Sequence, residues 1–417
     1  MSRPDPRPSP KRDRDLASRA LFYSSGALAC AIGRIAGRSS RPENGALLVV
    51  QLGDIGDLVL TSPFIRELGR AAANQGQDLV LVVKPGVHGI AELCPYASRV
   101  HSFDARRTRV AGALSGLLRA RRFARSELAG EFESAWNTRF DLDELGATFL
   151  MLNSGATRRI GYSEHVVPSK ELRNHGYDCL LTDPVMPARG ASRHEVDRLL
   201  ALLEASEVPV VNRDLELWLA DEDRDAARSI LIQAGGRLPV ALGVGAGHPK
   251  RCWPAARFAQ VAERLNQDHN AIAVLVGGPA ERAAADEIAA RSQAPILDAV
   301  GQLSLRVSAA LVAECGLFVG NDSGLLHIAA AAGLPIVETS CHPLGGDPEH
   351  PNSPERFGPY GTTAIVLRPG HPASPDCATG CESPEAHCIE AVPITEVLEG
   401  TARALAATRL GSNRAGN

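Results

Sequence analysis

The sequence lacks an apolar segment long enough to cross a lipid bilayer. No run of about 18 or more apolar residues occurs among its 417 residues. It also lacks the apolar centre and cleavage site of a secretory signal near its first residue. We therefore expect a protein that is neither exported nor transmembrane and that is located in the cytoplasm.

A strong charge of either sign is missing as well. The chain has 44 Lys and Arg against 48 Asp and Glu, a formal net charge of -4. This balance creates no global field that would hold nucleic acid, so nucleic acid is not an expected partner. The nine cysteines are odd in number and scattered, and several lie in apolar runs, which is typical of reduced thiols in a cytosolic chain.

The length exceeds what one hydrophobic core usually organises, so two domains are expected. We predict a disordered or amphipathic N-terminal extension over residues 1–44, a first domain over 45–220, a second over 221–400 and a tail over 401–417. Within the extension, Leu16 to Arg38 mixes apolar residues with arginines. Such a helix would lie on an anionic membrane surface or pack on the protein, and both interpretations stay open.

Strands and helices alternate from Ala46 onward. The first apolar run, 46–52, is typical of a strand buried in a parallel sheet, and a Gly-rich turn and a helix over 58–73 follow it. This alternation predicts two Rossmann-like α/β domains, each with a doubly wound parallel sheet. Further strands are predicted at 79–83, 134–137, 239–244, 271–276, 295–298, 317–319 and 335–338, and helices at 110–125, 142–152, 195–204 and 254–265.

The turn after the first strand reads Gly53-Asp-Ile-Gly-Asp57 and is not a GxGxxG fingerprint. Its two acids would repel the pyrophosphate of a dinucleotide, so a redox cofactor is disfavoured. Asp57 directly precedes the predicted helix. It would therefore act as a helix N-cap or as a general base in an active site.

A second Gly-rich turn, ending at Gly247, follows a strand of the second domain and would let a ligand approach closely. Lys250 and Arg251 come next and offer positive charge to a diphosphate leaving group. Their alternative role is that of solvated cations, although the helix dipole disfavours positive charge at a helix start.

The stretch from Phe318 to Pro335 predicts a strand, a polar turn, a helix and a new strand. Ser323 and Gly324 lie at the start of this helix, where unpaired amides form an anion site suited to a pyrophosphate. His327, one turn further on, would reach the same group or remain a core residue. Asp322 would otherwise serve only as a cap.

In combination and order, these segments resemble glycosyltransferase family 9, the heptosyltransferases that build the inner core of lipopolysaccharide. The resemblance runs from about Ala46 to Leu398 and is carried by LLVVQLGDIGDLVLTSPFIREL, RRIGYS, HEVDRLLALLE, GVGAGHPKRCWPAARFAQVAERL, LVGGPAE, VGQLSL and FVGNDSGLLHIAAAAGLPIV. It implies a GT-B fold, in which two Rossmann-like domains face each other across a cleft. It also implies an inverting single displacement that requires no metal or other cofactor.

The resemblance assigns roles to particular residues. Asp57 matches the general base that takes the proton of the acceptor hydroxyl, whereas Asp54 is not part of the match. Arg251 stands at the position of a phosphate-binding lysine, with Lys250 as a substitute. The other implied donor contacts are Ser323, Gly324 and His327 at the diphosphate, Asp322 at the sugar, Glu281 at the ribose and Leu303 at the base.

Two regions depart from the family pattern. The loop from Glu338 to Pro351 is longer than usual and carries an extra acid, which leaves the donor sugar preference open. Near the C-terminus, Cys377, Cys381 and Cys388, with His371 and His387 nearby, suggest zinc, but their spacing is not a known finger pattern. The favoured interpretation is that no metal binds.

An arginine-rich segment, 99–125, lies in the domain expected to receive the acceptor. Arg106, Arg107 and Arg109 are its candidate acceptor-binding residues, since an anionic lipid headgroup or an acidic sugar would suit them. The segment would alternatively form a solvated helix face.

The expected function is that of an inverting glycosyltransferase. It would move a sugar, expected to be heptose, from a nucleotide diphosphate donor such as ADP-heptose to a lipid-linked or oligosaccharide acceptor of the lipopolysaccharide core. An anionic membrane surface is a further expected partner, which would make the protein peripheral on the inner membrane. The alternatives are a sugar-nucleotide epimerase of the same architecture and a catalytically silent binding module.

Overall fold

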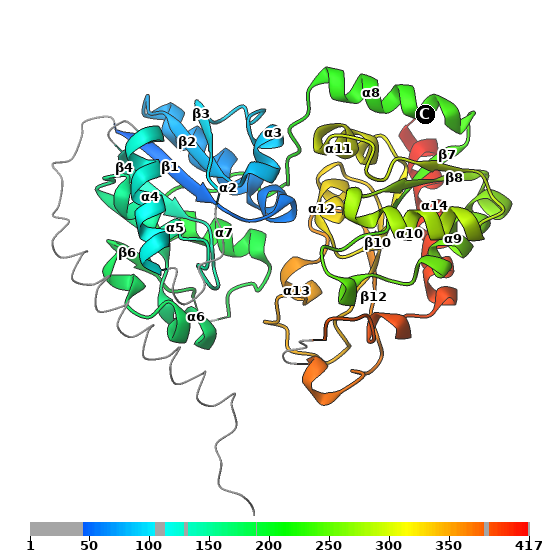
Figure 1. Ribbon diagram of the computed structural model, residues 1–417. Helices are drawn as coiled ribbons and strands as arrows, with labels where there is room; N and C mark the ends of the chain where they lie inside the picture. Colours follow the sequence, from blue (N-terminus) through cyan, green and yellow to red (C-terminus); the bar gives the residue numbers. More distant parts are fainter. Residues whose placement is uncertain (1–44, 105–112, 129–131, 189, 379–382, 416–417) are drawn as a thin grey trace, which may run out of the picture.

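The computed structural model describes residues 45–104, 113–128, 132–188, 190–378 and 383–415 (Figure 1). Arg106, Arg107 and Arg109, the candidate acceptor residues, lie outside these ranges, as do the extension 1–44 and Cys381. None of the helices in the described ranges combines the length and apolar character that crossing a membrane requires.

The first half of the chain forms a six-stranded sheet in which every neighbouring pair of strands is parallel. The strand order is β3-β2-β1-β4-β5-β6, so the sheet is doubly wound about β1, as predicted. Its strands are β1 (Ala46–Gln51), β2 (Leu79–Val83), β3 (Arg99–Ser102), β4 (Phe132–Asn137), β5 (Arg158–Tyr162) and β6 (Asp183–Val185). Its helices are α2 (Ile55–Asn74), α3 (His88–Ala91), α4 (Ala113–Glu127), α5 (Ala147–Asn153), α6 (Pro168–Arg173) and α7 (Glu195–Glu204).

The second half repeats this architecture with a parallel sheet in the order β12-β11-β10-β7-β8-β9. Its strands are β7 (Leu238–Gly243), β8 (Ala271–Val276), β9 (Ile296–Asp298), β10 (Leu317–Asn321), β11 (Ile336–Thr339) and β12 (Ala364–Leu367). Its helices are α8 (Asp221–Leu231), α9 (Ala255–His269), α10 (Arg282–Arg291), α11 (Leu305–Ala313), α12 (Gly324–Ala331), α13 (Pro354–Phe357) and α14 (Ile394–Ala415). Helix α14 continues across residue 400 and buries Thr401 and Leu405 in the second domain.

The continuous apolar sequence of β1 reflects burial on both faces of its sheet. Leu47 and Val49 pack in one core cluster with residues of α2, whereas Leu48 and Val50 pack in another with residues of α4 and α5. Successive side chains of a strand point to opposite faces, so both faces of the sheet are covered by helices (Figure 1).

Several elements differ from the prediction for local reasons. Helix α2 begins at Ile55, three residues earlier than expected, and this places Asp57 in its first turn rather than before it. Helix α5 begins at Ala147 instead of 142, since the Asp143 carboxylate accepts the backbone N–H groups of Ala147 and Thr148 and caps the helix there. The short strands β3, β5 and β6 were not predicted, because they have few or no consecutive apolar residues. Strand β12 was not predicted either, although its four residues are all apolar.

The cysteines also depart from one expectation. Cys94, Cys252, Cys315, Cys341, Cys377 and Cys388 are thiols. Cys179 is disulfide-bonded, so the interpretation of the cysteines as reduced thiols does not hold at that residue.

The segment between α7 and α8 contains no helix or strand, and a buried arginine of α2 holds it in place. The Arg66 guanidinium donates to the carbonyl oxygens of Asn212 at 2.6 Å and Asp214 at 2.8 Å. It also pairs with Glu67 and Glu216, each at 2.9 Å. This one side chain therefore ties the chain leaving the first domain to the longest helix of that domain.

Replacing Arg66 by Met is expected to lower the free energy of unfolding by about 3 kcal/mol or more, since it leaves buried carboxylate and carbonyl groups without their partner. Urea denaturation followed by circular dichroism measures the change. Arg70→Met is the matched control, because Arg70 is 50% exposed and pairs with the same Glu67. It should cost less than about 1 kcal/mol. Equal losses in the two variants would contradict this role of Arg66.

Candidate functional site

A cavity of about 1040 Å³ opens between the two domains. On the first-domain side it is lined by the turn after β1 and the loop after β4, which include Asp57 and Arg139. The second domain contributes Asp347, Glu349 and Arg356 from the segment between β11 and β12. A ligand in this cavity would therefore touch both domains, in the region where open α/β sheets bind their ligands.

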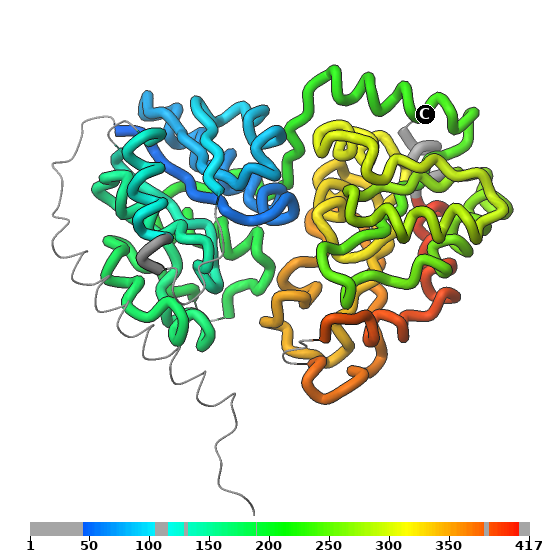
Figure 2. Tube along the Cα trace, in the orientation of Figure 1, coloured from blue at the N-terminus to red at the C-terminus, as the bar shows by residue number. Residues whose placement is uncertain are grey.

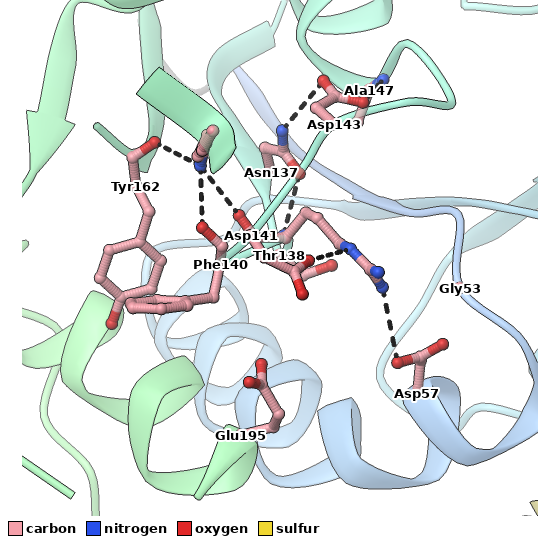
Figure 3. A network of polar contacts seen from close by, with 12 residues as sticks. Gly53, Asp57, Asn137, Thr138, Phe140, Asp141, Asp143, Ala147, Tyr162 and Glu195 are labelled. Atoms are coloured by element: carbon pink, nitrogen blue, oxygen red, sulfur yellow. Dashed lines mark hydrogen bonds and ion pairs between the residues drawn. The ribbon is translucent and has the colours of Figure 1, made fainter. Parts of the chain in front are cut away.

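The two carboxylate oxygens of Asp57 have different surroundings. Oδ2 accepts the backbone N–H of Asp54 at 2.9 Å and so caps α2 from its first turn. Oδ1 lies 3.7 Å from Arg139 Nη1, and the side chain is 28% exposed and lines the cavity (Figure 3). The capping and the general-base interpretations are thus geometrically compatible, since the cap leaves Oδ1 facing the cavity.

Arg139 links Asp57 to a second carboxylate. Its Nε lies 2.7 Å from Asp141 Oδ1, and the side chain is 41% exposed beside the cavity. Desolvation lowers the pKa of this guanidinium, but the carboxylates of Asp141 and Asp57 outweigh that effect and hold its pKa above the ordinary value. Arg139 therefore remains a cation next to the candidate base.

The loop that presents Arg139 is held by a buried ammonium group. Lys170 Nζ donates to the carbonyl oxygens of Phe140 at 3.0 Å and Tyr162 at 2.8 Å, and the loop lies between Asn137 and Asp143 in Figure 3. Burial lowers the pKa of Lys170 to about 8. Because its ammonium group donates these hydrogen bonds, the buried lysine fixes the course of the backbone that carries the cavity-lining side chains.

Arg356 connects the second domain to the same loop. It is buried, and its guanidinium pairs with Glu195 of α7 and lies 3.2 Å from Asp141 Oδ2. A second arginine, Arg198, pairs with Glu195 at 3.2 Å and with Glu349 at 2.5 Å. The charges on the two sides of the cavity are therefore joined by an alternating chain of arginines and carboxylates.

The predicted donor residues gather at the carboxyl ends of β7 and β10. Arg251 donates to the carbonyl oxygen of Ala246 through Nε at 3.0 Å and Nη2 at 2.7 Å, and its Nη1 lies 3.4 Å from Asp322 Oδ2. Gly247 adopts a φ of 65°, which favours glycine in this turn. The Arg251 charge is thereby fixed next to Asp322, with Lys250 adjacent in sequence.

Helix α12 starts against α2 of the other domain. A Cβ on Gly324 would lie 2.0 Å from Ile55 Cγ2, and one on Gly56 would lie 2.6 Å from His327 Cδ2. Only glycine allows this close approach. The half-buried residue Gly324 at the start of α12 therefore packs against Ile55 and Gly56, the two residues before Asp57.

His327 is buried beneath this contact. Its Nδ1 has no hydrogen-bond partner among the described residues, and burial lowers its pKa to about 4, so the imidazole is neutral. Contact of His327 with a phosphate stays a prediction. Glu281 lies against Gly245 in the turn after β7, and Leu303 packs half-buried on the core.

Glu338 lies in β11 beside Gly320 of β10 and is only 1% exposed. Its Oε2 has no hydrogen-bond partner among the described residues. Desolvation, together with the charge of Asp322, raises its pKa well above the ordinary value. The first residue of the loop noted in the sequence is thus a buried carboxyl group with a raised pKa at the donor side.

Some residues of the site were not identified from the sequence. Arg139, Asp141 and Arg356 lie in segments without a motif, and their proximity depends on the packing of the two domains. Asn321 carried a weak signal, a polar residue at a strand end. It is fully buried, accepts the backbone N–H of Trp253 at 2.9 Å and donates to the Val244 carbonyl at 3.0 Å, so it pins the donor-side turns.

Two doubly wound domains with a shared cavity define the GT-B class of fold. Solved structures agree: glycosyltransferase family 9 from Veillonella parvula has a TM-score of 0.70 at 21% identity, covering 88% of this chain and 99% of that one. The Escherichia coli ADP-heptose lipopolysaccharide heptosyltransferase II has a TM-score of 0.63 at 19% identity, covering 87% and 99%.

Residues 142–387 match the family described as "Glycosyltransferase family 9 (heptosyltransferase)", and the chain belongs to this family. Lipooligosaccharide heptosyltransferase 2 of Haemophilus ducreyi is 32% identical over 124 residues, 29% of this chain. Lipopolysaccharide heptosyltransferase 2 of Escherichia coli is 34% identical over 124 residues, again 29% of this chain. In both relatives the match spans 33% of their own length.

Glu338→Gln tests the protonation of the buried carboxyl. A carboxyl with a pKa raised by folding stabilises the fold below its unfolded pKa, about 4.3, and this stabilisation is lost as pH rises toward the folded pKa. The melting temperature of the variant, relative to wild type, should therefore increase as the pH rises above the unfolded pKa of the carboxyl group. Glu399→Gln, at an exposed position of α14, is the control. A difference independent of pH would contradict the assignment.

Proposed function

We propose that this protein is an inverting glycosyltransferase that moves a heptose from ADP-heptose to a lipopolysaccharide-core acceptor. The observation that carries the proposal is the position of Asp57. Its Oδ1, paired with Arg139, lines the cavity shared by the domains, and the neighbouring residue Gly56 packs against Gly324 at the start of α12.

The proposed reaction is a single displacement. The acceptor hydroxyl gives its proton to Asp57 Oδ1 while its oxygen attacks the anomeric carbon of the donor sugar. The bond between that carbon and the diphosphate oxygen breaks, and the electron pair leaves with the diphosphate. Attack opposite to the leaving group inverts the configuration at the anomeric carbon.

The departing charge would be received by the second domain. Arg251 supplies a fixed positive charge, and the amides of Ser323 and Gly324 offer hydrogen bonds at the positive end of a helix dipole. Asp322 would contact the donor sugar, Glu281 the ribose and Leu303 the base. With these groups around the diphosphate, no metal or other cofactor is required at the reacting atoms.

The cavity would hold the acceptor. Arg139, partly exposed and fixed next to Asp57, would pair with an anionic group of a core oligosaccharide. Arg106, Arg107 and Arg109 would extend this positive surface.

The preference for heptose as the sugar and for ADP as the nucleotide rests on the family. A thermal-shift comparison of ADP-, UDP- and GDP-sugars tests this preference, since the bound donor raises the melting temperature of the protein.

We place the protein in the cytoplasm, peripheral on the inner membrane, where a nucleotide sugar and a lipid-linked acceptor would meet. The basis is the sequence from Leu16 to Arg38, which mixes apolar and basic residues. Cell fractionation of the full chain and of a chain lacking residues 1–44 tests it.

Asp57→Asn is expected to lower turnover by about 10²- to 10⁴-fold, because the amide cannot accept the acceptor proton. Donor affinity should stay within about twofold, since the side-chain oxygen of Asn still accepts the Asp54 N–H and keeps the cap. Nucleotide release measures turnover, and isothermal titration calorimetry with the unreacted donor measures affinity.

Asp54→Asn is the matched control, since Asp54 belongs to the same turn but pairs with Lys84 at its exposed edge. It should keep most of the activity. Retained turnover in Asp57→Asn would contradict the role of the base. Conversion of the donor sugar without any acceptor would instead indicate an epimerase.

A further inference from the structure

The segment between β12 and α14, residues 368–393, is long and contains only two short 3₁₀ turns, Pro375–Ala378 and Ile389–Ala391, in its described part. Figure 2 follows it in orange and red along the second domain. Segments of this length with so little regular structure are uncommon in compact domains unless something holds them. Its fixed course in the described residues therefore needs an explanation.

Three potential metal ligands meet within this segment. The ligand atoms of Cys377, His387 and Cys388 all lie within 4.8 Å of one another. Cys377 Sγ is 3.7 Å from His387 Nδ1 and 4.0 Å from Nε2. A tetrahedral zinc ion, with Zn–S near 2.3 Å and Zn–N near 2.0 Å, places neighbouring ligand atoms about 3.5 to 3.8 Å apart. The observed spacing therefore fits an ion after a small contraction.

The surroundings of the two sulfur atoms suit thiolates. The backbone N–H of Ala373 donates to Cys388 Sγ at 3.3 Å, and Ser374 Oγ lies 3.0 Å from Cys377 Sγ within hydrogen-bonding distance. Both cysteines are buried. Two buried thiolates require a compensating positive charge, which a divalent cation bound between them would supply.

We propose that Cys377, His387 and Cys388 bind one zinc ion, with a role separate from the transfer reaction. Thiolate and imidazole ligands select zinc over Mg²⁺ or Ca²⁺, which prefer oxygen. The three side chains occupy three corners of the tetrahedron, and the fourth is left to water or another ligand. Cys381 lies outside the described residues and is assigned no part in the site.

The segment that holds the zinc site is hydrogen-bonded to two parts of the candidate active site. The carbonyl oxygen of Ala378, next to Cys377, accepts the backbone N–H of Asp347 in the loop that lines the cavity, at 2.8 Å. Further along, the Val392 carbonyl accepts Trp253 Nε1 at 3.1 Å, two residues after Arg251. Loosening the segment would therefore disturb the loop and the turn that face the ligands.

Metal analysis of the purified full-length protein tests the proposal without any measurement of activity. After expression in zinc-supplemented medium, we expect about one zinc per chain by inductively coupled plasma mass spectrometry. Cys377→Ser and Cys388→Ser should each retain less than about a fifth of that amount. Cys315→Ser is the control, since Cys315 is a buried thiol outside the cluster, and it should keep the full stoichiometry.

Cobalt exchange adds a signature of the ligand set, because Co²⁺ bound by two thiolates shows intense charge-transfer and visible bands that should disappear in Cys377→Ser. His387→Ala, at a half-buried position, provides the same test if a cysteine variant fails to fold. Wild-type protein without zinc and without cobalt uptake, full zinc in both cysteine variants, or iron in place of zinc would each overturn the proposal.

Discussion

The close contact between the first turns of α2 and α12 is the constraint on which the candidate active site depends. Gly56 and Gly324 leave no room for a Cβ, and their absence of side chains lets two helix starts from different domains meet. Each helix begins at the carboxyl edge of its own sheet. The contact therefore brings the turn that carries Asp57 against the helix start of the other domain, an arrangement that neither domain would achieve alone.

A second set of forces shapes the cavity next to this contact. Arg356 reaches from α13 to Glu195 and Asp141 of the first domain, and Asp141 in turn holds Arg139 beside Asp57. Buried ion pairs of this kind are weak evidence for stability, because desolvation offsets much of their attraction. Their effect here is geometric: alternating charges with defined partners fix one relative arrangement of the domains and one position of the cation at the base.

The sequence predicted the two doubly wound domains because buried parallel strands such as β1 and β8 are continuous apolar runs, and α7 was placed at its observed bounds. It missed β3 and β6, whose polar residues have no such signal. At the site, Asp57, Arg251 and Ser323 follow recognisable turns and could be named in advance. Arg139 and Arg356 could not, since their roles arise from contacts between segments far apart in the chain.

The central claim is that Asp57 and the diphosphate of the donor share one site across the α2–α12 contact. A crystal structure with a bound nucleotide diphosphate tests it most directly. The account predicts phosphate oxygens on the amides of Ser323 and Gly324 and next to Arg251, with Asp57 Oδ1 facing the position of the sugar. A nucleotide bound in the first domain, or a diphosphate remote from these amides, would contradict it.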